Sequence, residues 1–93
     1  MDTITALLLV KTRLNKLRSD TSLDDYFTAR IKSAVEELNG IGIKLTESTE
    51  DLLLVVDYTV WKYQNRDNQM GMPQWLRLCR RERWIREGLK DDS

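Results

Sequence analysis

The apolar residues of this 93-residue chain recur mostly three or four positions apart, which is the spacing of amphipathic helices. A first helix is predicted from Thr3, as its N-cap, to about residue 17. Leu9 lies away from the apolar stripe of this helix, so it is expected to be exposed or covered by something outside the helix pair. The stripe itself consists of Leu7, Val10, Leu14 and Leu17.

A second helix is predicted between Ser22 and Gly40. Ser22 and Asp25 resemble a capping box at its start, and Asn39 with Gly40 is expected to end it in a left-handed conformation. One face of this helix is apolar along its whole length. That face consists of Leu23, Phe27, Ile31, Ala34, Val35 and Leu38.

Apolar and polar residues alternate between Gly40 and Ser48, which predicts an extended connector. Its apolar side chains, Ile41, Ile43 and Leu45, are expected to pack onto the helices. No other segment of the sequence offers a partner strand.

A third helix is predicted from Ser48 or Thr49 to about residue 64, and it carries two apolar stripes on nearly opposite sides. Either this helix is central in the domain and buried on both sides, or the second stripe is exposed in the monomer and is covered by a neighbouring subunit. The first stripe is Leu52, Val56, Val60 and Tyr63, and the second, a candidate interface, is Leu54, Tyr58 and Trp61.

A fourth helix is predicted from about Pro73 to Glu87, with Gly88 as its stop and a frayed tail over residues 88–93. Its buried face is expected to be Trp75, Leu78, Cys79 and Ile85, and its other face to carry Arg77, Arg80, Arg81 and Arg83 around Trp84. The pattern as a whole predicts one all-α domain over residues 1–93, a small bundle of four helices.

The composition of the chain argues against some classes of function. Fifteen basic and fifteen acidic residues give a net charge of zero, which argues against a protein that coats free DNA. A domain this small has a thin stability margin, which self-association would improve. Cys79 has no second cysteine to pair with, so a reducing cytoplasm is expected. We also expect neither a signal peptide nor a membrane-spanning helix.

The sequence offers no parts for catalysis. It has no histidine, and its acidic pairs are adjacent residues that project in different directions along a helix. No glycine-rich phosphate loop and no calcium loop is present. We therefore expect no enzyme activity, no bound metal and no cofactor.

The segment from Arg77 to Arg86 contains five arginines and is locally basic. Three interpretations remain open: a solvated face, a docking surface for an acidic protein, and phosphate contacts to nucleic acid. Trp84 among the arginines favours a protein partner, because aromatic residues and arginine are enriched at interface centres. The linkers, about eight to ten residues long, do not fit a helix-turn-helix. The candidate contact residues here are Arg77, Arg80, Arg81 and Trp84.

The order of several features resembles a known family, the head-tail connector proteins of long-tailed bacteriophages and prophages, also labelled DNA-packaging or head-completion adaptors. The resemblance extends from the first helix to about Leu78. Its most specific parts are the aspartate pair Asp24-Asp25, the apolar helix that runs into Trp61-Lys62-Tyr63-Gln64-Asn65-Arg66, and Met72-Pro73. The arginine-dense segment near the C-terminus matches no motif of that family.

The resemblance implies a structural subunit in a homo-oligomeric ring of about a dozen copies below the portal. Its partners would be the portal protein and the next head-completion or tail protein, with DNA only as the passing genome. It would act at the virion neck after assembly in the host bacterial cytoplasm, with no membrane contact. The alternative is a small nucleic-acid-binding regulator that uses the arginine-rich last helix.

Overall fold

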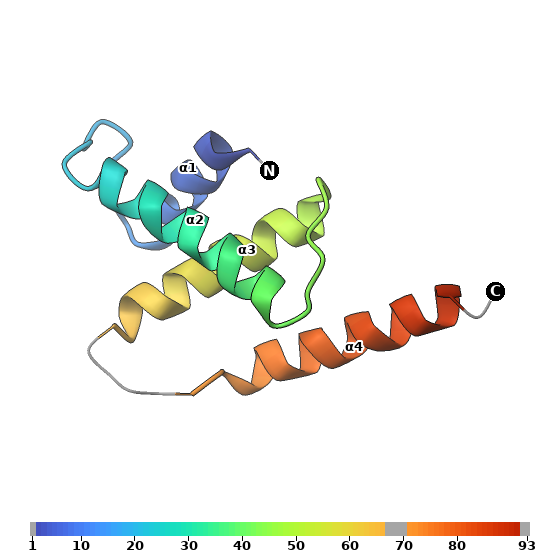
Figure 1. The fold of residues 1–93 in the computed structure, drawn as a ribbon. Coiled ribbons are helices and arrows are strands. Elements are labelled where there is room, and N and C mark those ends of the chain that lie inside the picture. Colours follow the sequence, from blue (N-terminus) through green and yellow to red (C-terminus); the bar gives the residue numbers. More distant parts are fainter. Residues whose placement is uncertain (1, 67–70, 92–93) are drawn as a thin grey trace.

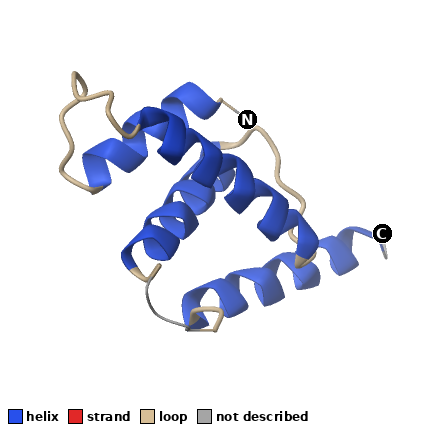
Figure 2. Ribbon diagram, turned by 60° about the vertical axis from the view of Figure 1, so that its left-hand side comes forward, coloured by secondary structure: helices blue, strands red, loops and turns tan. Residues whose placement is uncertain are grey.

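In the computed structural model, the chain forms four α-helices joined by loops (Figure 1). The structure describes residues 2–66 and 71–91. The helices are α1 (Thr3–Arg13), α2 (Asp24–Gly40), α3 (Thr49–Gln64) and α4 (Gln74–Asp91), and the described ranges contain no strand (Figure 2). The prediction of an all-α bundle of four helices is confirmed.

Helices α1, α2 and α3 pack against one another, and α4 lies along one side of them (Figures 1 and 2). We call residues 2–66 the body of the molecule. α3 has more buried residues than α1 or α2, among them Leu54, Val56 and Val60. The core consists of Ala6, Val10, Phe27, Ile31, Ala34, Leu38, Ile43, Leu54, Val55, Val56, Val60 and Leu76.

Helix α1 is shorter than the pattern predicts. Asp2, not Thr3, is the N-cap, and its carboxylate accepts hydrogen bonds from the backbone N–H groups of Ile4 and Thr5. The helix ends at Arg13 because Asn15 adopts a left-handed conformation with φ 58°. Leu17 therefore lies outside the helix and is 72% exposed, so its predicted place on the apolar stripe was wrong.

The loop between α1 and α2 is held by a buried lysine. The Lys11 ammonium donates to the backbone carbonyls of Arg18 (3.0 Å) and Asp20 (2.7 Å) and lies 3.0 Å from a carboxylate oxygen of Asp24. The buried side of α1 thus includes Ala6 and Lys11 beside the predicted Val10.

Both ends of α2 differ in detail from the prediction. Ser22 donates its hydroxyl to Asp20 at 2.7 Å instead of forming a capping box, so the helix begins at Asp24. At the other end the left-handed residue is Gly42 (φ 93°), because the helix continues through Gly40. The N–H of Ile43 bonds to the Leu38 carbonyl at 3.0 Å, which completes a Schellman cap.

The connector between α2 and α3 runs without regular secondary structure over residues 43–48, as predicted. Ile43 is fully buried, and Ile41 and Leu45 pack partly against the core. The connector is therefore fixed to the helices by the side chains that alternate along it. Near its end, Thr46 and Ser48 form hydrogen bonds with Asp51 in the first turn of α3.

Candidate interaction surface

Helix α4 begins directly after Pro73, whose carbonyl accepts from the N–H groups of Leu76 (3.1 Å) and Arg77 (3.2 Å). The helix continues through Gly88 to Asp91, so the predicted stop at Gly88 and a frayed stretch over residues 88–91 were wrong; residues 92 and 93 lie outside the described part. One glycine costs a helix only about 1 kcal/mol, which is too little to end it.

The side of α4 that faces the body agrees with the prediction only at Cys79. Leu76 is fully buried, Cys79 packs against the core, and Arg83 points inward. Trp75, Leu78 and Ile85, which were predicted to be buried, are exposed instead. Leu76, Cys79 and Arg83 follow one another at spacings of three and four, so the correct face was present in the pattern. It was hidden because one of its members is an arginine.

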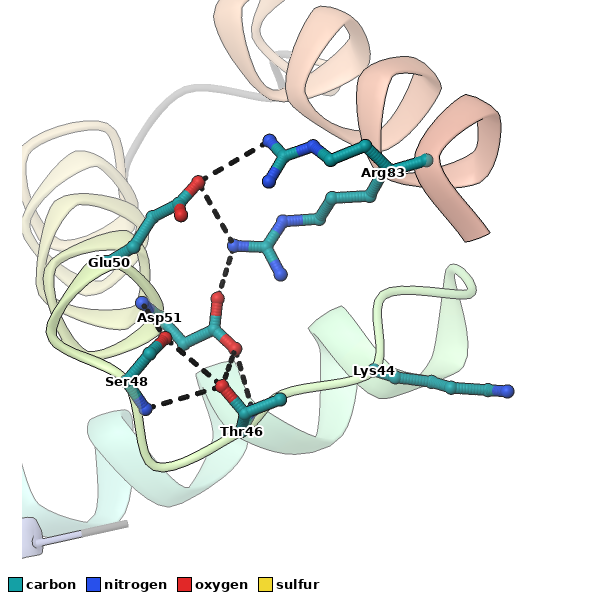
Figure 3. A pocket seen from close by; sticks show the side chains of 7 residues that line it. Lys44, Thr46, Ser48, Glu50, Asp51 and Arg83 are labelled. Carbon is teal, nitrogen blue, oxygen red and sulfur yellow. Dashed lines mark hydrogen bonds and ion pairs between the residues drawn. The ribbon is translucent and has the colours of Figure 1, made fainter. Parts of the chain in front are cut away.

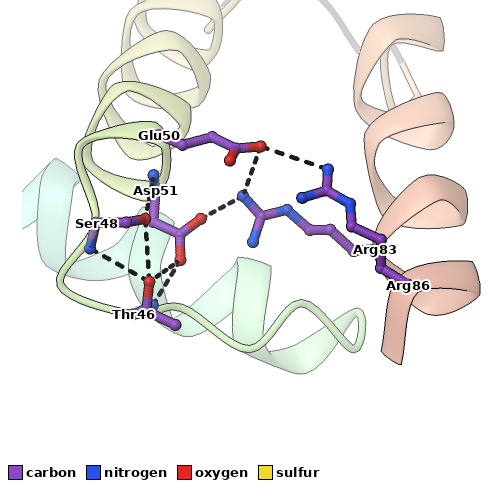
Figure 4. A network of polar contacts seen from close by, with 6 residues as sticks. All are labelled: Thr46, Ser48, Glu50, Asp51, Arg83 and Arg86. Carbon is purple, nitrogen blue, oxygen red and sulfur yellow. Dashed lines mark hydrogen bonds and ion pairs between the residues drawn. The ribbon is translucent and has the colours of Figure 1, made fainter. Parts of the chain in front are cut away.

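Asp51 and Arg83 join α4 to the start of α3 (Figure 4). The Arg83 guanidinium donates to one carboxylate oxygen of Asp51, and the Thr46 N–H (2.6 Å) and hydroxyl (2.8 Å) donate to the other. Ser48 is the N-cap of α3, and its hydroxyl accepts a hydrogen bond from the Asp51 N–H at 3.2 Å. We call these four residues, Thr46, Ser48, Asp51 and Arg83, the polar joint.

The electrostatics of the polar joint favour the charged forms of both partners. Burial opposes the charge of Asp51, but hydrogen bonds from Arg83 and Thr46 outweigh it and hold the pKa of the carboxyl below its usual value. Burial likewise opposes the charge of Arg83, and its interactions with Asp51 and Cys79 together outweigh burial and raise the pKa of the guanidinium. The pair therefore stays ionised at neutral pH.

A shallow pocket of about 180 Å³ lies beside the polar joint (Figure 3). Lys44, Arg83 and Arg86 line it together with the carboxylates of Glu50 and Asp51. Glu50 lies 3.9 Å from Arg83 and 3.5 Å from Arg86. Because the two arginines already face carboxylates of the same chain, the pocket serves to attach α4 and leaves little positive charge for a ligand.

Trp84 covers the turn at the end of α2. A Cβ atom added at Gly42 would lie 3.0 Å from the Trp84 indole nitrogen, so this glycine allows the close approach of the ring. The Arg80 guanidinium lies over the Trp84 ring, 5.2 Å from its centroid. Trp84 remains 54% exposed, and with Arg80 it forms one edge of the surface of α4.

The exposed face of α4 combines apolar side chains with arginine. Leu78 is 52% exposed and Ile85 is 55% exposed. Arg77 and Arg81 are exposed beside them, and no ion pair or hydrogen bond holds either guanidinium within the described part of the chain. We call this set, Arg77, Leu78, Arg81 and Ile85, the outer face of α4. Trp75 is not part of it, because Trp75 borders a cleft with Val60 and Trp61 of α3.

The structure distributes the remaining predicted interface residues over two environments. Leu54 is buried (7% exposed) and Leu9 packs partly against the core, so internal contacts account for most of the surface of both. Tyr58 and Trp61 are half-buried and stack on each other with centroids 6.1 Å apart. Trp61 also lines a groove with Met72, Arg77 and Leu78, which places it next to α4.

Tyr58 keeps its proton at any physiological pH. Burial, together with the negative charge of Glu37, raises the pKa of its phenol to about 12. Glu37 is itself held by Lys62, whose ammonium lies 2.6 Å from the carboxylate. This cluster ties α2 to α3 and does not resemble an acid–base pair.

The described residues offer neither a metal site nor a membrane-spanning helix. Residues 2–66 and 71–91 contain no group of three or more cysteine, aspartate or glutamate residues that could hold a metal ion. No helix in the same ranges is long and apolar enough to cross a membrane.

Comparison of the chain with known protein families, with curated proteins and with solved structures found no match.

Proposed function

We propose that this protein is a structural subunit of a phage or prophage particle, a head-tail connector that assembles into a ring below the portal. The observation that carries the proposal is the outer face of α4, where two half-exposed aliphatic side chains lie beside two unpaired arginines on a protein of zero net charge. Apolar groups next to arginine are typical of protein interfaces. The resemblance of residues 1–78 to connector proteins supplies the biological setting.

In this setting the partners are other copies of the chain, the portal protein and the next head-completion or tail protein. The site of action is the virion neck, after assembly in the host bacterial cytoplasm. We propose no catalytic role, no metal and no cofactor, because the polar clusters of the described residues are structural ion pairs that join helices.

The second candidate is a nucleic-acid-binding regulator, which the arginine content of α4 favours. The contacts of the arginines within the chain argue against this candidate. Arg83 and Arg86 face carboxylates and Arg80 lies over Trp84, which leaves Arg77 and Arg81 for phosphate groups. Two such contacts would give weak binding with a shallow salt dependence.

The test is the mass of the purified protein by light scattering over a concentration series, alone and with the portal protein of the same phage or prophage. A ring-sized species in either condition supports the connector function. A strict monomer in both conditions contradicts it. Tight, salt-sensitive binding of that monomer to duplex DNA would then establish the regulator.

A further inference from the structure

Arg77, Arg80 and Trp84 lie along one edge of α4. Their spacings of three, four and seven residues place the three side chains on the same side of the helix. The edge adjoins the turn at Gly42, on which the Trp84 ring lies. Neither arginine forms an ion pair with a carboxylate within the described part of the chain, whereas Arg83 does. We call Arg77, Arg80 and Trp84 the arginine–tryptophan edge.

The Trp84 side chain is held in place by two groups of its own chain, the Gly42 turn and the Arg80 guanidinium over the ring. A guanidinium that lies over an aromatic ring can still donate its N–H groups to a carboxylate. An aromatic side chain that is already fixed loses little conformational freedom when it is bound. Because tryptophan and arginine often carry much of the binding energy at protein interfaces, the edge is preformed for a contact.

The charge of the arginine–tryptophan edge requires carboxylates that this chain does not offer in surplus. Residues 2–66 contain nine basic and ten acidic residues, so the body has a net charge of −1. Half of these ten carboxylates are already paired with cations of the same chain. The pairs are Lys11–Asp24, Arg13–Asp57, Lys62–Glu37, Arg83–Asp51 and Arg86–Glu50. The complementary surface therefore belongs to a different, acidic molecule.

The apolar content of α4 favours a protein over nucleic acid. Trp84 is 54% exposed, and Leu78 and Ile85 of the adjoining outer face are 52% and 55% exposed. Surfaces that bind nucleic acid are more polar and much more positively charged than protein interfaces. Two of the five arginines of α4 are already paired with Asp51 and Glu50. The surface that remains is thus as apolar as it is basic.

We propose that the arginine–tryptophan edge binds an acidic segment of a different protein, whose carboxylates pair with Arg77 and Arg80 and whose apolar side chain packs on Trp84. The inference rests on the proposed function, in which each copy binds proteins other than itself. It specifies the chemistry of one such partner.

Fluorescence anisotropy of a labelled peptide tests this contact. The probe is a short peptide in which aspartates and glutamates surround one phenylalanine. We expect it to bind the natural chain at low ionic strength. A peptide with asparagine and glutamine in place of the acids should bind about tenfold more weakly, because it lacks the charges that pair with arginine. A peptide with alanine in place of phenylalanine should also bind more weakly.

Variants of the chain assign the residues. Arg77→Glu and Arg80→Glu should each weaken binding of the acidic peptide by about tenfold. Trp84→Ala should weaken it with the helical circular dichroism unchanged, and Trp84→Phe, which keeps an aromatic ring, should retain most of the affinity. Arg18→Glu is the matched control and should leave the affinity unchanged. Arg18 is exposed in the loop between α1 and α2, which lies away from α4 (Figures 1 and 2).

Three outcomes would overturn the inference. They are no binding of the acidic peptide, equal losses in Arg80→Glu and Arg18→Glu, and a higher affinity for single- or double-stranded DNA that the same edge variants abolish. A chain that forms rings but does not bind the peptide overturns this inference and leaves the connector function standing. A chain that stays monomeric alone and with the portal protein overturns the connector function, whether or not the peptide binds.

Discussion

Lys11 and Asp51 are the charged residues with the most deeply buried side chains in the described part of the molecule. Each is saturated by partners that fix a loop or a helix in place. Lys11 donates hydrogen bonds to two carbonyls of the loop between α1 and α2. Asp51 links Thr46, in the segment between α2 and α3, to Arg83 of α4. A buried charge of this kind fixes the geometry of the groups around it, but it adds little to the net free energy of folding. The reason is that the cost of removing the charge from water offsets much of its attraction to its partners.

Removal of the Lys11 ammonium should be costly. Lys11→Met keeps the aliphatic chain but leaves two backbone carbonyls and the Asp24 carboxylate without their cation, so we expect the free energy of unfolding in urea to fall by about 3 kcal/mol. Lys16→Met is the matched control, because Lys16 is exposed in the same loop, and it should change stability by less than about 0.5 kcal/mol. Equal effects at both positions would show that the buried contacts of Lys11 contribute nothing.

The polar joint should make stability depend on acidic pH. The pKa of Asp51 is lower in the folded state than the ordinary value of about 3.9 in the unfolded chain. Its contribution is therefore complete above about pH 5 and is lost as the pH falls through the folded pKa. Urea unfolding between pH 7 and pH 3 should show this loss in the natural chain.

Asp51→Asn should reduce that pH dependence and lower stability at pH 7 by about 1 to 3 kcal/mol, because Arg83 loses its charged acceptor. Glu50→Gln is the control at the neighbouring position. The Glu50 side chain is 63% exposed, so its loss should matter by less than about 1 kcal/mol at pH 7. If Asp51→Asn lost as much stability between pH 7 and pH 3 as the natural chain, the assigned role of the carboxylate would be contradicted.

At the scale of the elements, residues in left-handed conformation decide where two helices end. Asn15 ends α1 and Gly42 ends α2, and in both caps a backbone N–H bonds to the carbonyl five residues before it, Lys16 to Lys11 and Ile43 to Leu38. The second cap has an added constraint, because the Trp84 ring lies on it.

Gly42→Ala should lower the free energy of unfolding by about 1 to 2 kcal/mol, since alanine is strained at a φ of 93° and its methyl group would press on the Trp84 indole. Gly40→Ala supplies the contrast. Gly40 lies within α2 with open space around it, so the same exchange there should raise stability by about 0.5 kcal/mol. Thermal unfolding of the two variants gives the comparison, and an equal sign for both would contradict it.

Leu76 is the apolar anchor of α4, and it is fully buried. Leu76→Ala should cost about 2 to 4 kcal/mol, and hydrogen exchange should become faster along α4 before it does in the body. Leu78→Ala, two positions on and half-exposed, should cost less than about 1 kcal/mol in the monomer. Uniform exchange along the whole chain in Leu76→Ala would show that α4 and the body unfold as one unit.

For the whole molecule, the important feature is an uneven distribution of charge on a neutral chain. The segment from Gln74 to Arg86 carries a net charge of +4 and lies on one side of the body, whereas the body itself, residues 2–66, carries a net charge of −1 (Figure 1). In the proposed ring, contacts between copies through α4 would combine Coulomb attraction, which salt screens, with apolar burial, which salt does not weaken.

When salt rises from about 0.05 M to about 0.5 M, self-association should therefore weaken but not disappear, because only the Coulomb attraction is screened. Light scattering of the natural chain and of Arg81→Glu at both salt concentrations measures this. The natural chain should lose affinity and the variant should lose none. Association of the natural chain that is fully abolished by salt would mean that Leu78 and Ile85 are not in the contact.

The sequence predicted the helices because their apolar residues repeat at helical spacing, and it predicted the connector because Ile41, Ile43 and Leu45 alternate with polar residues. It failed where one side chain overrides the periodic pattern. The conformation of Asn15 shortens α1, and the ion pair of Arg83 with Asp51 turns α4 by placing an arginine inward. Such a pair joins residues 32 positions apart, so no local pattern contains it. The resemblance to connector proteins stays a prediction.

The positions of the tryptophans have a practical consequence. All three lie on α4 or at the end of α3 that adjoins it, namely Trp61, Trp75 and Trp84, whereas the rest of the body contains tyrosine and phenylalanine only. Indole emission is therefore a natural reporter of α4, while the far-ultraviolet dichroism averages over every helix. Unfolding curves recorded with the two signals will coincide if α4 melts together with the body, and will separate if it detaches first.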